Sequence, residues 1–435
     1  CLNVLEKAFD KILLAGIPCM AVPLLSSDCR NTSVDEDWVM EQIKLPHVTQ
    51  QAKSSSYLPL MRAAADLFKP DSLQKLSPRL RGAASTAQGL AGVDPIAATE
   101  AIAHDFMAEG GKHMRPFGTL AVYDALTGGH GTQSDGAEHL ASTSDSVRRT
   151  ALAMEAFHKA SLVHDDIQDD DAYRYGAETL HRKFGIPTAI NVGDYLIGLG
   201  YRLLSRCKGD LGAEATMELV DRLADAHLRL SEGQGAELVW RDAKDKRLAP
   251  IDALKIYALK TSPAFEAALM SGVRLAGSTD AYRESIPAFC KHVGVAFQIL
   301  NDLKDWKGDD DNKLGSAGDV IGGRPTVLWA LALEALAEPQ RQELLELAAA
   351  PQKTPAMIAR VRALYEQARV FDKAARLVDK YQEKAEATAD EIQPDELRRL
   401  LYYFIDTVLD RSSALPDEKP ALPIVALGAP KTVRS

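Results

Sequence analysis

Five aspartates lie within seven residues of segment 161–176, which reads SLVHDDIQDDDAYRYG. Asp165 and Asp169 are one helical turn apart, so on a helix their carboxylates share a face. Two stacked carboxylates repel each other unless a cation lies between them. Their hard oxygen atoms suit Mg²⁺, which keeps several waters and takes further ligands from phosphates. The pattern therefore predicts a metal-bound anion, although a solvated acidic loop has the same composition.

A second polar cluster, Asn301, Asp302 and Asp305, lies far downstream. Like the first, it directly follows an apolar segment, which favours the metal interpretation over a solvated loop. Segment 110–116, GGKHMRP, offers the opposite charge. Lys112 and Arg115 project to one side if a helix starts there, and a helix N-terminus favours phosphate. Two acidic clusters with scattered bases predict a diphosphate pocket.

The elements that must position these residues are helices. The chain has 435 residues, 46% of them hydrophobic and only 6% aromatic, and Ala and Leu are abundant. From Asp94 to about Arg411, periodic apolar segments alternate with short Gly, Pro and Asp breaks, and no alternating strand pattern stands out. A further helix is expected around Tyr57 to Phe68, and a loop over Gly128 to Asp145. We predict an all-α bundle with a central cavity between the two acidic helices.

Composition also limits the partners and the compartment. The net charge of −10 argues against nucleic acid. Cysteines Cys1, Cys19, Cys29, Cys207 and Cys290 form no disulfide framework, which favours a reducing cytosol and a cytoplasmic protein. The longest apolar run, residues 12–25, is too short and too interrupted to span a bilayer. The chain starts with Cys, which is consistent with a piece of a longer protein.

Six segments together resemble the trans-isoprenyl diphosphate synthases, the polyprenyl synthetase family. In order they are GGKHMRP, HKASLVHDDIQDD, GQGAEL, LKTSPAF, GVAFQILNDLKD and GGRPT. The resemblance implies the isoprenoid synthase-type helical bundle, with residues 91–411 as the synthetase domain. Residues 1–90 would form an N-terminal extension of unknown role, and 412–435 a disordered tail. Family members are usually homodimers, so a homodimer is expected.

The resemblance also implies roles for particular residues. The metal ligands would be Asp165, Asp166, Asp169, Asn301, Asp302 and Asp305, and the metal Mg²⁺. The allylic diphosphate would be held by Arg174, Lys260, Lys313 and Arg324. The diphosphate of isopentenyl diphosphate would be held by Lys112, Arg115 and His158. Thr261 and Gln298 would line the place where the allylic cation develops.

Three positions depart from the family pattern. Asn301 stands where Asp is usual, Tyr175 where a second arginine is usual, and Arg324 where Lys is usual. Class I terpene cyclases share the fold and have a second metal motif that opens with Asn-Asp, so a cyclase remains an alternative. A cyclase would not need Lys112, Arg115 and His158, and all three are present. A non-catalytic regulatory subunit is a third possibility, against which the intact first aspartate motif argues.

Product length depends on the side chains beneath the first aspartate. Ala160 and Ser161, one turn before Asp165, are both small. Phe157 lies about 11 Å below Asp165 at 5.4 Å per turn, and is either the floor of the cavity or an ordinary core residue. As a floor it would give a product of twenty carbons, geranylgeranyl diphosphate, or somewhat longer.

Overall fold

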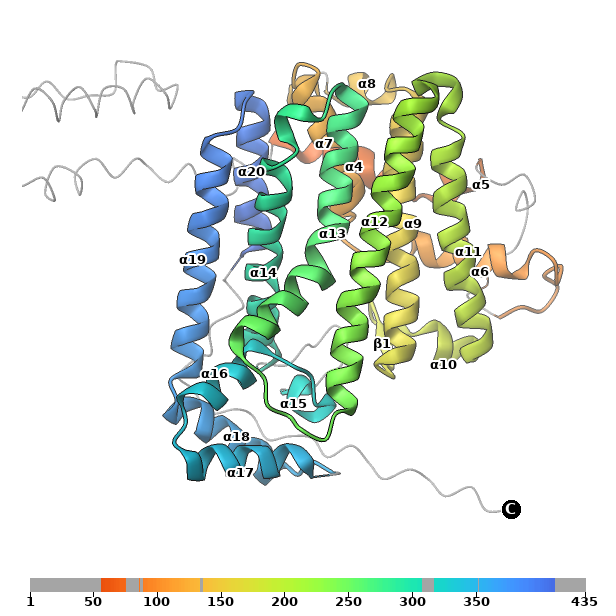
Figure 1. The fold of residues 1–435 in the computed structure, drawn as a ribbon. Coiled ribbons are helices and arrows are strands. Elements are labelled where there is room, and N and C mark those ends of the chain that lie inside the picture. The colour runs from red at the N-terminus through yellow and green to blue at the C-terminus, as the bar shows by residue number, and fades with distance from the viewer. Residues whose placement is uncertain are drawn as a thin grey trace, which may run out of the picture. The chain divides into compact units, whose positions relative to one another are not determined.

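Long helices run side by side through most of the computed structural model (Figure 1). The structure describes residues 56–75, 86, 89–133, 136–306, 317–350 and 352–410. Cys1, Cys19, Cys29, Lys313 and the predicted tail lie outside these ranges. Within them, Cys207 and Cys290 are buried free thiols, and no helix is long and apolar enough to cross a membrane.

The elements, in chain order, are α4 (Leu58–Asp66), α5 (Pro70–Gln74), α6 (Ala98–Ala108), α7 (Met114–Leu126), η4 (His130–Thr132), α8 (Gly136–Ala141), α9 (Asp145–Gln168), β1 (Tyr173–Arg174), β2 (Ala177–Glu178), α10 (Leu180–Phe184), α11 (Ile186–Ser205), α12 (Lys208–Asp242), α13 (Pro250–Ala276), η5 (Asp280–Tyr282), α14 (Ser285–Asp305), α15 (Gly318–Gly322), α16 (Val327–Ala335), α17 (Glu338–Ala349), α18 (Pro355–Gln367), α19 (Val370–Asp390) and α20 (Asp395–Val408).

The predicted all-α class is confirmed. Among the described residues, the two strands are a minimal hairpin, β1 and β2, paired antiparallel with Tyr173 opposite Glu178. The helix expected around Tyr57 to Phe68 is α4. The loop expected over residues 128–145 was wrong in part, since it contains η4 and α8. Both are shorter than two helical turns, so they carry no periodic apolar pattern that a sequence could show.

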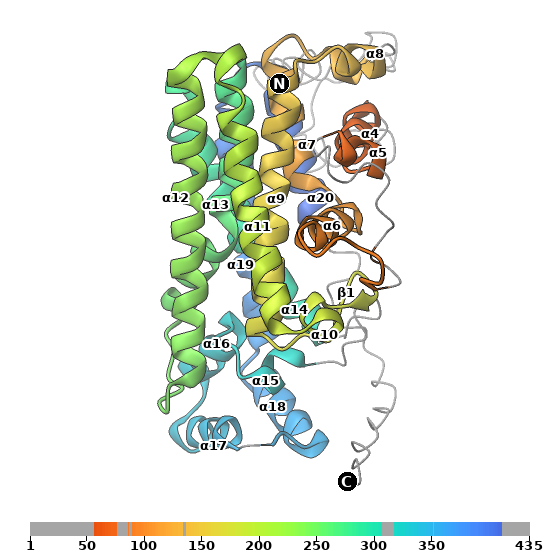
Figure 2. The same ribbon diagram turned by 90° about the vertical axis from the view of Figure 1, so that its right-hand side faces the viewer.

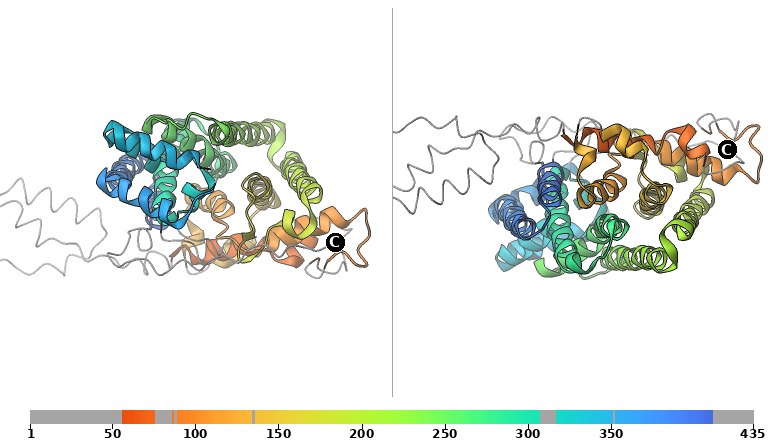
Figure 3. Two further views of the ribbon diagram at one scale, coloured as in Figure 1. Left: turned by 90° about the horizontal axis from the view of Figure 1, so that it is seen from below. Right: turned by 90° about the horizontal axis from the view of Figure 1, so that it is seen from above.

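Two apolar cores hold the helices. One is built mainly from α7, α13, α14, α16, α19 and α20, and the other from α6, α9, α11 and α12. Leu60 and Ala64 of α4 belong to the first core, so a helix from the predicted N-terminal extension packs into the synthetase body. The boundary at residue 90 stays a prediction. Figure 3 looks along the long helices from both ends.

Helix α9 carries the first acidic motif at its C-terminal end. Its start is capped by Ser144, whose hydroxyl accepts from the Val147 N–H at 3.4 Å. Small side chains such as Ala151, Ala153 and Ala156 are buried along it, which lets neighbouring helices approach. Helix α9 ends at Gln168 and the Asp169 N–H still bonds the Asp165 carbonyl, so the aspartates lie at the helix terminus. Figure 2 shows α9 beside α11, against which it packs.

Helix α13 positions the central basic segment. Pro263 lies inside it and lacks the N–H that would bond one turn back, so the helix is weakened beside Lys260. Helix α12 comes very close at this point. A Cβ on Gly233 would lie 2.8 Å from Leu259 Cβ and 2.9 Å from the Lys260 nitrogen. Only glycine allows this approach, which gives the first Gly of GQGAEL a packing role.

Candidate active site

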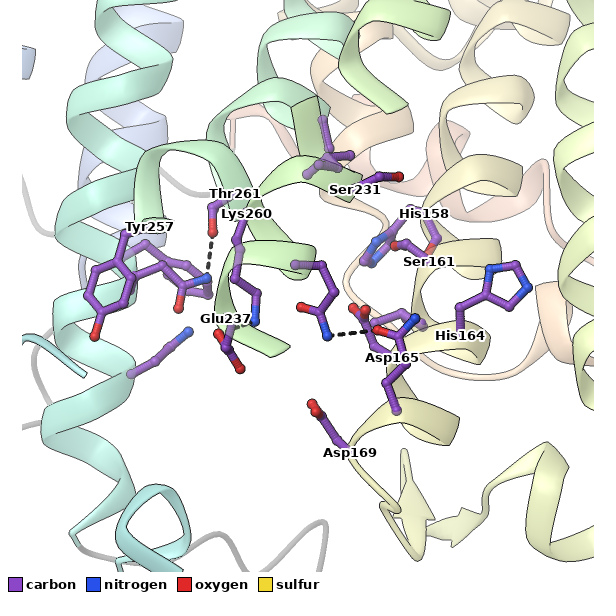
Figure 4. Close-up of a pocket in the computed structure, with 18 of the residues that line it drawn as sticks. His158, Ser161, His164, Asp165, Asp169, Ser231, Glu237, Tyr257, Lys260 and Thr261 are labelled. Atoms are coloured by element: carbon purple, nitrogen blue, oxygen red, sulfur yellow. Dashed lines mark hydrogen bonds and ion pairs between the residues drawn. The ribbon is translucent and has the colours of Figure 1, made fainter. Parts of the chain in front are cut away.

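A cavity of about 1130 Å³ opens between the two cores. Its walls come from α9, α12, α13, α14 and the segment from α15 to α16. Figure 4 shows Asp165, Asp169, Lys260 and Thr261 around this space. The predicted residues that line it are Arg115, His158, Asp165, Asp169, Arg174, Lys260, Thr261, Gln298, Asn301, Asp302, Asp305 and Arg324. The structure therefore brings together residues up to 209 positions apart in the chain (324 − 115).

Asp169 is the centre of an ion-pair network. One of its oxygens, Oδ1, accepts from Arg241 Nη1 at 2.6 Å, and the other, Oδ2, from Arg324 Nη2 at 3.2 Å. Arg241 also donates to the Gln168 carbonyl at 2.8 Å, and Arg324 lies 3.4 Å from Asp319. These contacts tie the end of α9 to α12 and to the segment after α15. In this structure the Asp169 carboxylate is therefore paired with two guanidinium cations.

Asp165 lies in an unfavourable electrostatic position. Burial raises its pKa to about 6, and the charges of Asp169 and Asp166 act in the same direction. Lys260 and Arg174 oppose the shift without cancelling it. The C-terminus of a helix also carries partial negative charge, which disfavours a carboxylate there. An added cation would relieve all of these interactions.

Asp166 occupies a different position from its neighbours. It is buried, it does not line the cavity, and Arg174 Nε donates to its Oδ1 at 2.9 Å. Arg174 also lies 3.4 Å from Asp171, which does line the cavity. The Asp166 contact therefore fixes Arg174 at the cavity edge, which is a positioning role. Its predicted role as a metal ligand stays a prediction.

All three members of the second polar cluster line the cavity, but they differ in burial and in their partners. Asn301 and Asp305 are half-buried and line the cavity. Asp302 is buried and its Oδ2 accepts from the Tyr257 hydroxyl and, at 3.2 Å, from the Val327 N–H. This carboxylate joins α13, α14 and α16. Burial, followed by the charge of Asp319, raises the pKa of Asp302 well above its usual range.

Asp319 is a cavity residue that the sequence analysis did not single out. Its backbone N–H donates to Asp305 Oδ2 at 3.0 Å, which brings the two carboxylates together. Burial, followed by the charge of Asp305, raises the pKa of Asp319 to about 7. Asp319 lies three residues before the GGRPT segment, so its closeness to that motif was the available signal.

Lys260 and its neighbours face the cavity from α13. Lys260 Nζ lies 2.6 Å from Glu237 Oε2, and Glu237 belongs to the GQGAEL segment on α12. Thr261 accepts a hydrogen bond from the Gln298 amide, so the two residues predicted to flank the developing cation are in contact. Two further residues were not predicted from the sequence: Arg241, four residues after Glu237, and Gln234, whose side-chain amide donates to Gln168 Oε1 at 2.8 Å.

Arg115 and His158 form the other end of the predicted basic set. Burial, followed by the charge of Arg115, lowers the pKa of His158 to about 3, so its imidazole is neutral at pH 7. The Glu155 carboxylate lies near both side chains, and its Oε1 is 3.3 Å from His113 Nδ1. Lys112 is exposed and does not line the cavity. Its predicted contact with a substrate stays a prediction.

The donor set fits a divalent cation with oxygen preference. Asp165, Asp169, Asn301, Asp305 and Asp319 supply only oxygen ligands, and the pKa values of Asp165, Asp305 and Asp319 are raised chiefly by burial. Across the described ranges, no three His, Cys, Asp or Glu side chains are already arranged around a metal position. The remaining ligands would therefore come from water and from a phosphate-bearing substrate.

Comparison with known proteins agrees with this geometry. The family model described as polyprenyl synthetase matches residues 97–368. A short chain isoprenyl diphosphate synthase from Methanocaldococcus jannaschii is 30% identical over 55% of this chain and 67% of its own length. A geranylgeranyl diphosphate synthase from Sulfolobus acidocaldarius is also 30% identical, over 57% of this chain and 70% of its own.

Solved structures extend the likeness to the fold. The structure of a geranylgeranyl pyrophosphate synthase from Corynebacterium glutamicum, complexed with isoprenyl diphosphate and magnesium, superposes with a TM-score of 0.63. The two chains are 22% identical, and the match covers 82% of this chain and 98% of that one. The predicted isoprenoid synthase-type bundle is thereby confirmed. The chain belongs to the polyprenyl synthetase family of trans-prenyltransferases.

Proposed function

We propose that this prenyltransferase condenses isopentenyl diphosphate with an allylic diphosphate in a Mg²⁺-dependent reaction and releases a longer trans-polyprenyl diphosphate. The observation that carries the proposal is the convergence of two polar clusters and three bases, Lys260, Arg174 and Arg324, on one cavity. The relatives' names and the magnesium and isoprenyl diphosphate in the Corynebacterium structure support it.

The two ends of the cavity would bind different substrates. The allylic diphosphate would lie near Lys260 and Arg324, between Asp165 or Asp169 on one side and Asn301 or Asp305 on the other. Mg²⁺ bound there would neutralise charge on the diphosphate. Isopentenyl diphosphate would lie toward Arg115 and His158. The neutral imidazole would donate or accept a hydrogen bond, and the guanidinium would supply charge.

The reaction follows from these positions. Lys260 and Arg324 stabilise the departing diphosphate, so the allylic C–O bond breaks and leaves a cation. The double bond of isopentenyl diphosphate attacks this cation to form the new C–C bond. A proton is then lost to the released diphosphate, and the chain is five carbons longer. Thr261 and Gln298 would face the cation, and the bound substrates would have to keep out water, which would trap it.

The part of the cavity that extends from Ser161 away from Asp165 is consistent with a product of about twenty carbons or more. Met154, Phe157, Leu223 and His227 line it beyond Ser161 and provide an apolar channel. The ring of Phe157 is packed edge-on against Tyr201 and His227, with centroids 4.9 and 5.5 Å apart. Phe157 therefore contributes to the floor and to the core at once.

We further propose that the enzyme is a homodimer that pairs through α12. Met217, Leu228 and Val239 on this helix are 61%, 67% and 74% exposed. They are spaced by 11 residues, about three helical turns, so they form one apolar stripe. Such a stripe along one helix suits the same helix of a second copy.

The deciding experiment is an incubation with Mg²⁺ and farnesyl diphosphate, with and without isopentenyl diphosphate, followed by mass analysis of hydrocarbons and dephosphorylated alcohols. A longer prenyl alcohol formed only with isopentenyl diphosphate is expected, and omission of Mg²⁺ or addition of EDTA should abolish it. A hydrocarbon or cyclic alcohol formed without isopentenyl diphosphate would replace the proposal by a terpene cyclase. No product from several allylic diphosphates would indicate a regulatory subunit.

A further inference from the structure

Lys159, the residue after His158 on α9, has no role in the site described above, yet its side chain is 0% exposed. It does not line the cavity. Its ammonium group donates to the carbonyl oxygen of Glu109 and lies 3.3 Å from that of Gly110. These carbonyls belong to the turn that leads from α6 into α7, and Arg115 follows in the first turn of α7.

The same ammonium group lies between two aromatic rings. It is 4.4 Å from the ring centroid of Tyr175 and 4.9 Å from that of Phe106. Faces of aromatic rings attract cations, and more strongly when water is excluded. Lys159 therefore joins three separate elements, the α6–α7 turn, α9 and the β1–β2 hairpin that carries Tyr175.

Tyr175 is held against the glycine turn at close range. A Cβ on Gly110 would lie 2.6 Å from Tyr175 Cγ, and one on Gly111 would lie 3.3 Å from its hydroxyl. Tyr175 itself has a φ of 54°, a backbone conformation that is uncommon for a side chain of this size. Both features indicate that the ring and the turn are built to fit each other.

Burying the charged side chain of a lysine costs free energy of desolvation, so such a residue is retained where its charge is used. Desolvation favours the neutral amine and lowers the pKa of Lys159 to about 8, so the group is mainly charged at pH 7. A methionine would fill a similar volume without that penalty. A charge retained at this position, one residue from His158, suggests an electrostatic use.

We propose that Lys159 is a positioning residue for isopentenyl diphosphate. Its ammonium group, covered by the Tyr175 ring, supplies the positive charge that an arginine at position 175 would otherwise supply. The inference rests on the proposed function. Lys159 holds the Gly110-Gly111 turn in the shape that presents the start of α7, with Lys112 and Arg115, to an anion. The ring of Tyr175 covers the ammonium and keeps water from screening it.

The first test measures steady-state kinetics of Lys159→Met with each substrate varied separately. The KM for isopentenyl diphosphate should rise about tenfold or more, as expected for loss of a charge-assisted contact. The KM for the allylic diphosphate and kcat should stay within about twofold, and Lys159→Arg should recover part of the loss. Lys183→Met is the matched control, because Lys183 lies 5.0 Å from the Phe184 ring but is exposed.

The second test moves the charge. Tyr175→Arg alone would place a guanidinium against Lys159 and should also raise the KM for isopentenyl diphosphate. The double variant Lys159→Thr with Tyr175→Arg should return the KM for isopentenyl diphosphate to near the wild-type value. A single cation would then again lie beside the Gly110-Gly111 turn. A double variant whose KM for isopentenyl diphosphate is no lower than that of Tyr175→Arg alone would refute the charge exchange.

The outcomes separate this inference from the proposed function. If wild-type protein makes no product, the proposed function fails first. If wild type is active and Lys159→Met changes neither KM, or changes both equally, the role of Lys159 is refuted. Should Lys159→Met fail to fold, as judged by circular dichroism, the comparison of Tyr175→Arg with the double variant decides alone.

Discussion

At the residue scale, the site is organised by where carboxylates meet cations. The pKa of Asp165 is raised by burial and by neighbouring carboxylates, whereas Asp169 is bound by two guanidinium groups. Asp166 and Asp302 share the same sequence motifs but are buried and bound by Arg174 and Tyr257. The two buried carboxylates hold basic or structural groups, and Asp302, unlike Asp166, also lines the cavity. This division explains why several adjacent acids are present.

Asp165→Ala should lower turnover by on the order of 10²–10³-fold, because it removes an oxygen ligand from the place where negative charge must be stabilised. Far-ultraviolet circular dichroism should be unchanged. The matched control is Asp170→Ala, since Asp170 belongs to the same acidic run but its side chain is 78% exposed and paired with Arg182. Equal losses in both variants would contradict the metal assignment, as would full activity of Asp165→Ala.

Glu155 should contribute stability that depends on pH. Burial alone would raise its pKa, but His113, His158 and Arg115 outweigh burial and lower the pKa to about 2, below the ordinary value of 4.5. The ionised form is therefore favoured by folding. The contribution is complete above pH 4.5 and is lost as the pH falls towards 2.

The comparison of wild type with Glu155→Gln measures this contribution. By urea unfolding, the difference in free energy of unfolding should be at most about 3 kcal/mol at pH 7 and should shrink as the pH falls below 4.5. A difference that stays constant between pH 7 and pH 3 would show that the charge of Glu155 is not responsible.

At the element scale, the close packing of α11 against α9 determines where Phe157 lies. A Cβ on Gly200 would lie 2.2 Å from Phe157 Cε2, so the ring occupies space that only glycine leaves open. Tyr201 and His227 hold the ring from two further sides. Gly200, on α11 and outside the acidic motifs, therefore fixes the position of the Phe157 ring in the cavity wall.

Gly200→Ala should therefore shorten the product by about one five-carbon unit, because the added methyl group pushes the Phe157 ring towards the cavity. The strain should cost about 1–3 kcal/mol in the free energy of unfolding. Mass analysis of the dephosphorylated products gives the chain length, and thermal unfolding gives the stability.

The same helix supplies the control. Gly198→Ala adds a methyl group to α11 where nothing lies within 4 Å. Its products should be unchanged, and its stability should be equal or greater because alanine favours helix. If Gly200→Ala lowers stability but leaves product length unchanged, then α11 moves away rather than Phe157, and the ring does not form the floor.

At the scale of the whole molecule, two apolar cores flank one polar cavity. One core includes α9 and α12 and the other α13 and α14, so each brings one set of functional residues to the shared space. The apolar stripe on α12 lies on a helix that also lines the cavity with Gln234 and Glu237. Pairing of two copies through this helix would support the cavity wall.

Leu228→Glu should convert the proposed dimer to a monomer, because it places a charge within the apolar stripe of both copies. Sedimentation velocity at several concentrations measures the change in mass. Ile96→Glu is the control, since Ile96 is 80% exposed but lies away from α12 in the chain. A wild-type protein that sediments as a monomer at all concentrations would refute the dimer.

The sequence by itself determined the helical class and the six ordered motifs, and most of the site residues that it predicted line the cavity. These depend on local spacing, such as the one-turn separation of Asp165 and Asp169, and on residue types suited to one chemistry. It also exposed the unusual Tyr175 and Asn301. It left open which members of the acidic runs face the cavity and which side chains bind them.

Only the tertiary structure decided those points, because they depend on how separate helices meet. The contact of Asp169 with Arg241 spans 72 residues, and its contact with Arg324 spans 155. Nothing in the sequence singles out Lys159, whose surroundings form only where the Gly110 turn and the Tyr175 ring meet it. The close approach of Gly200 to the Phe157 ring likewise exists only because α11 packs against α9. Helical periodicity specifies a face, whereas interhelical packing specifies which atoms of that face are in contact.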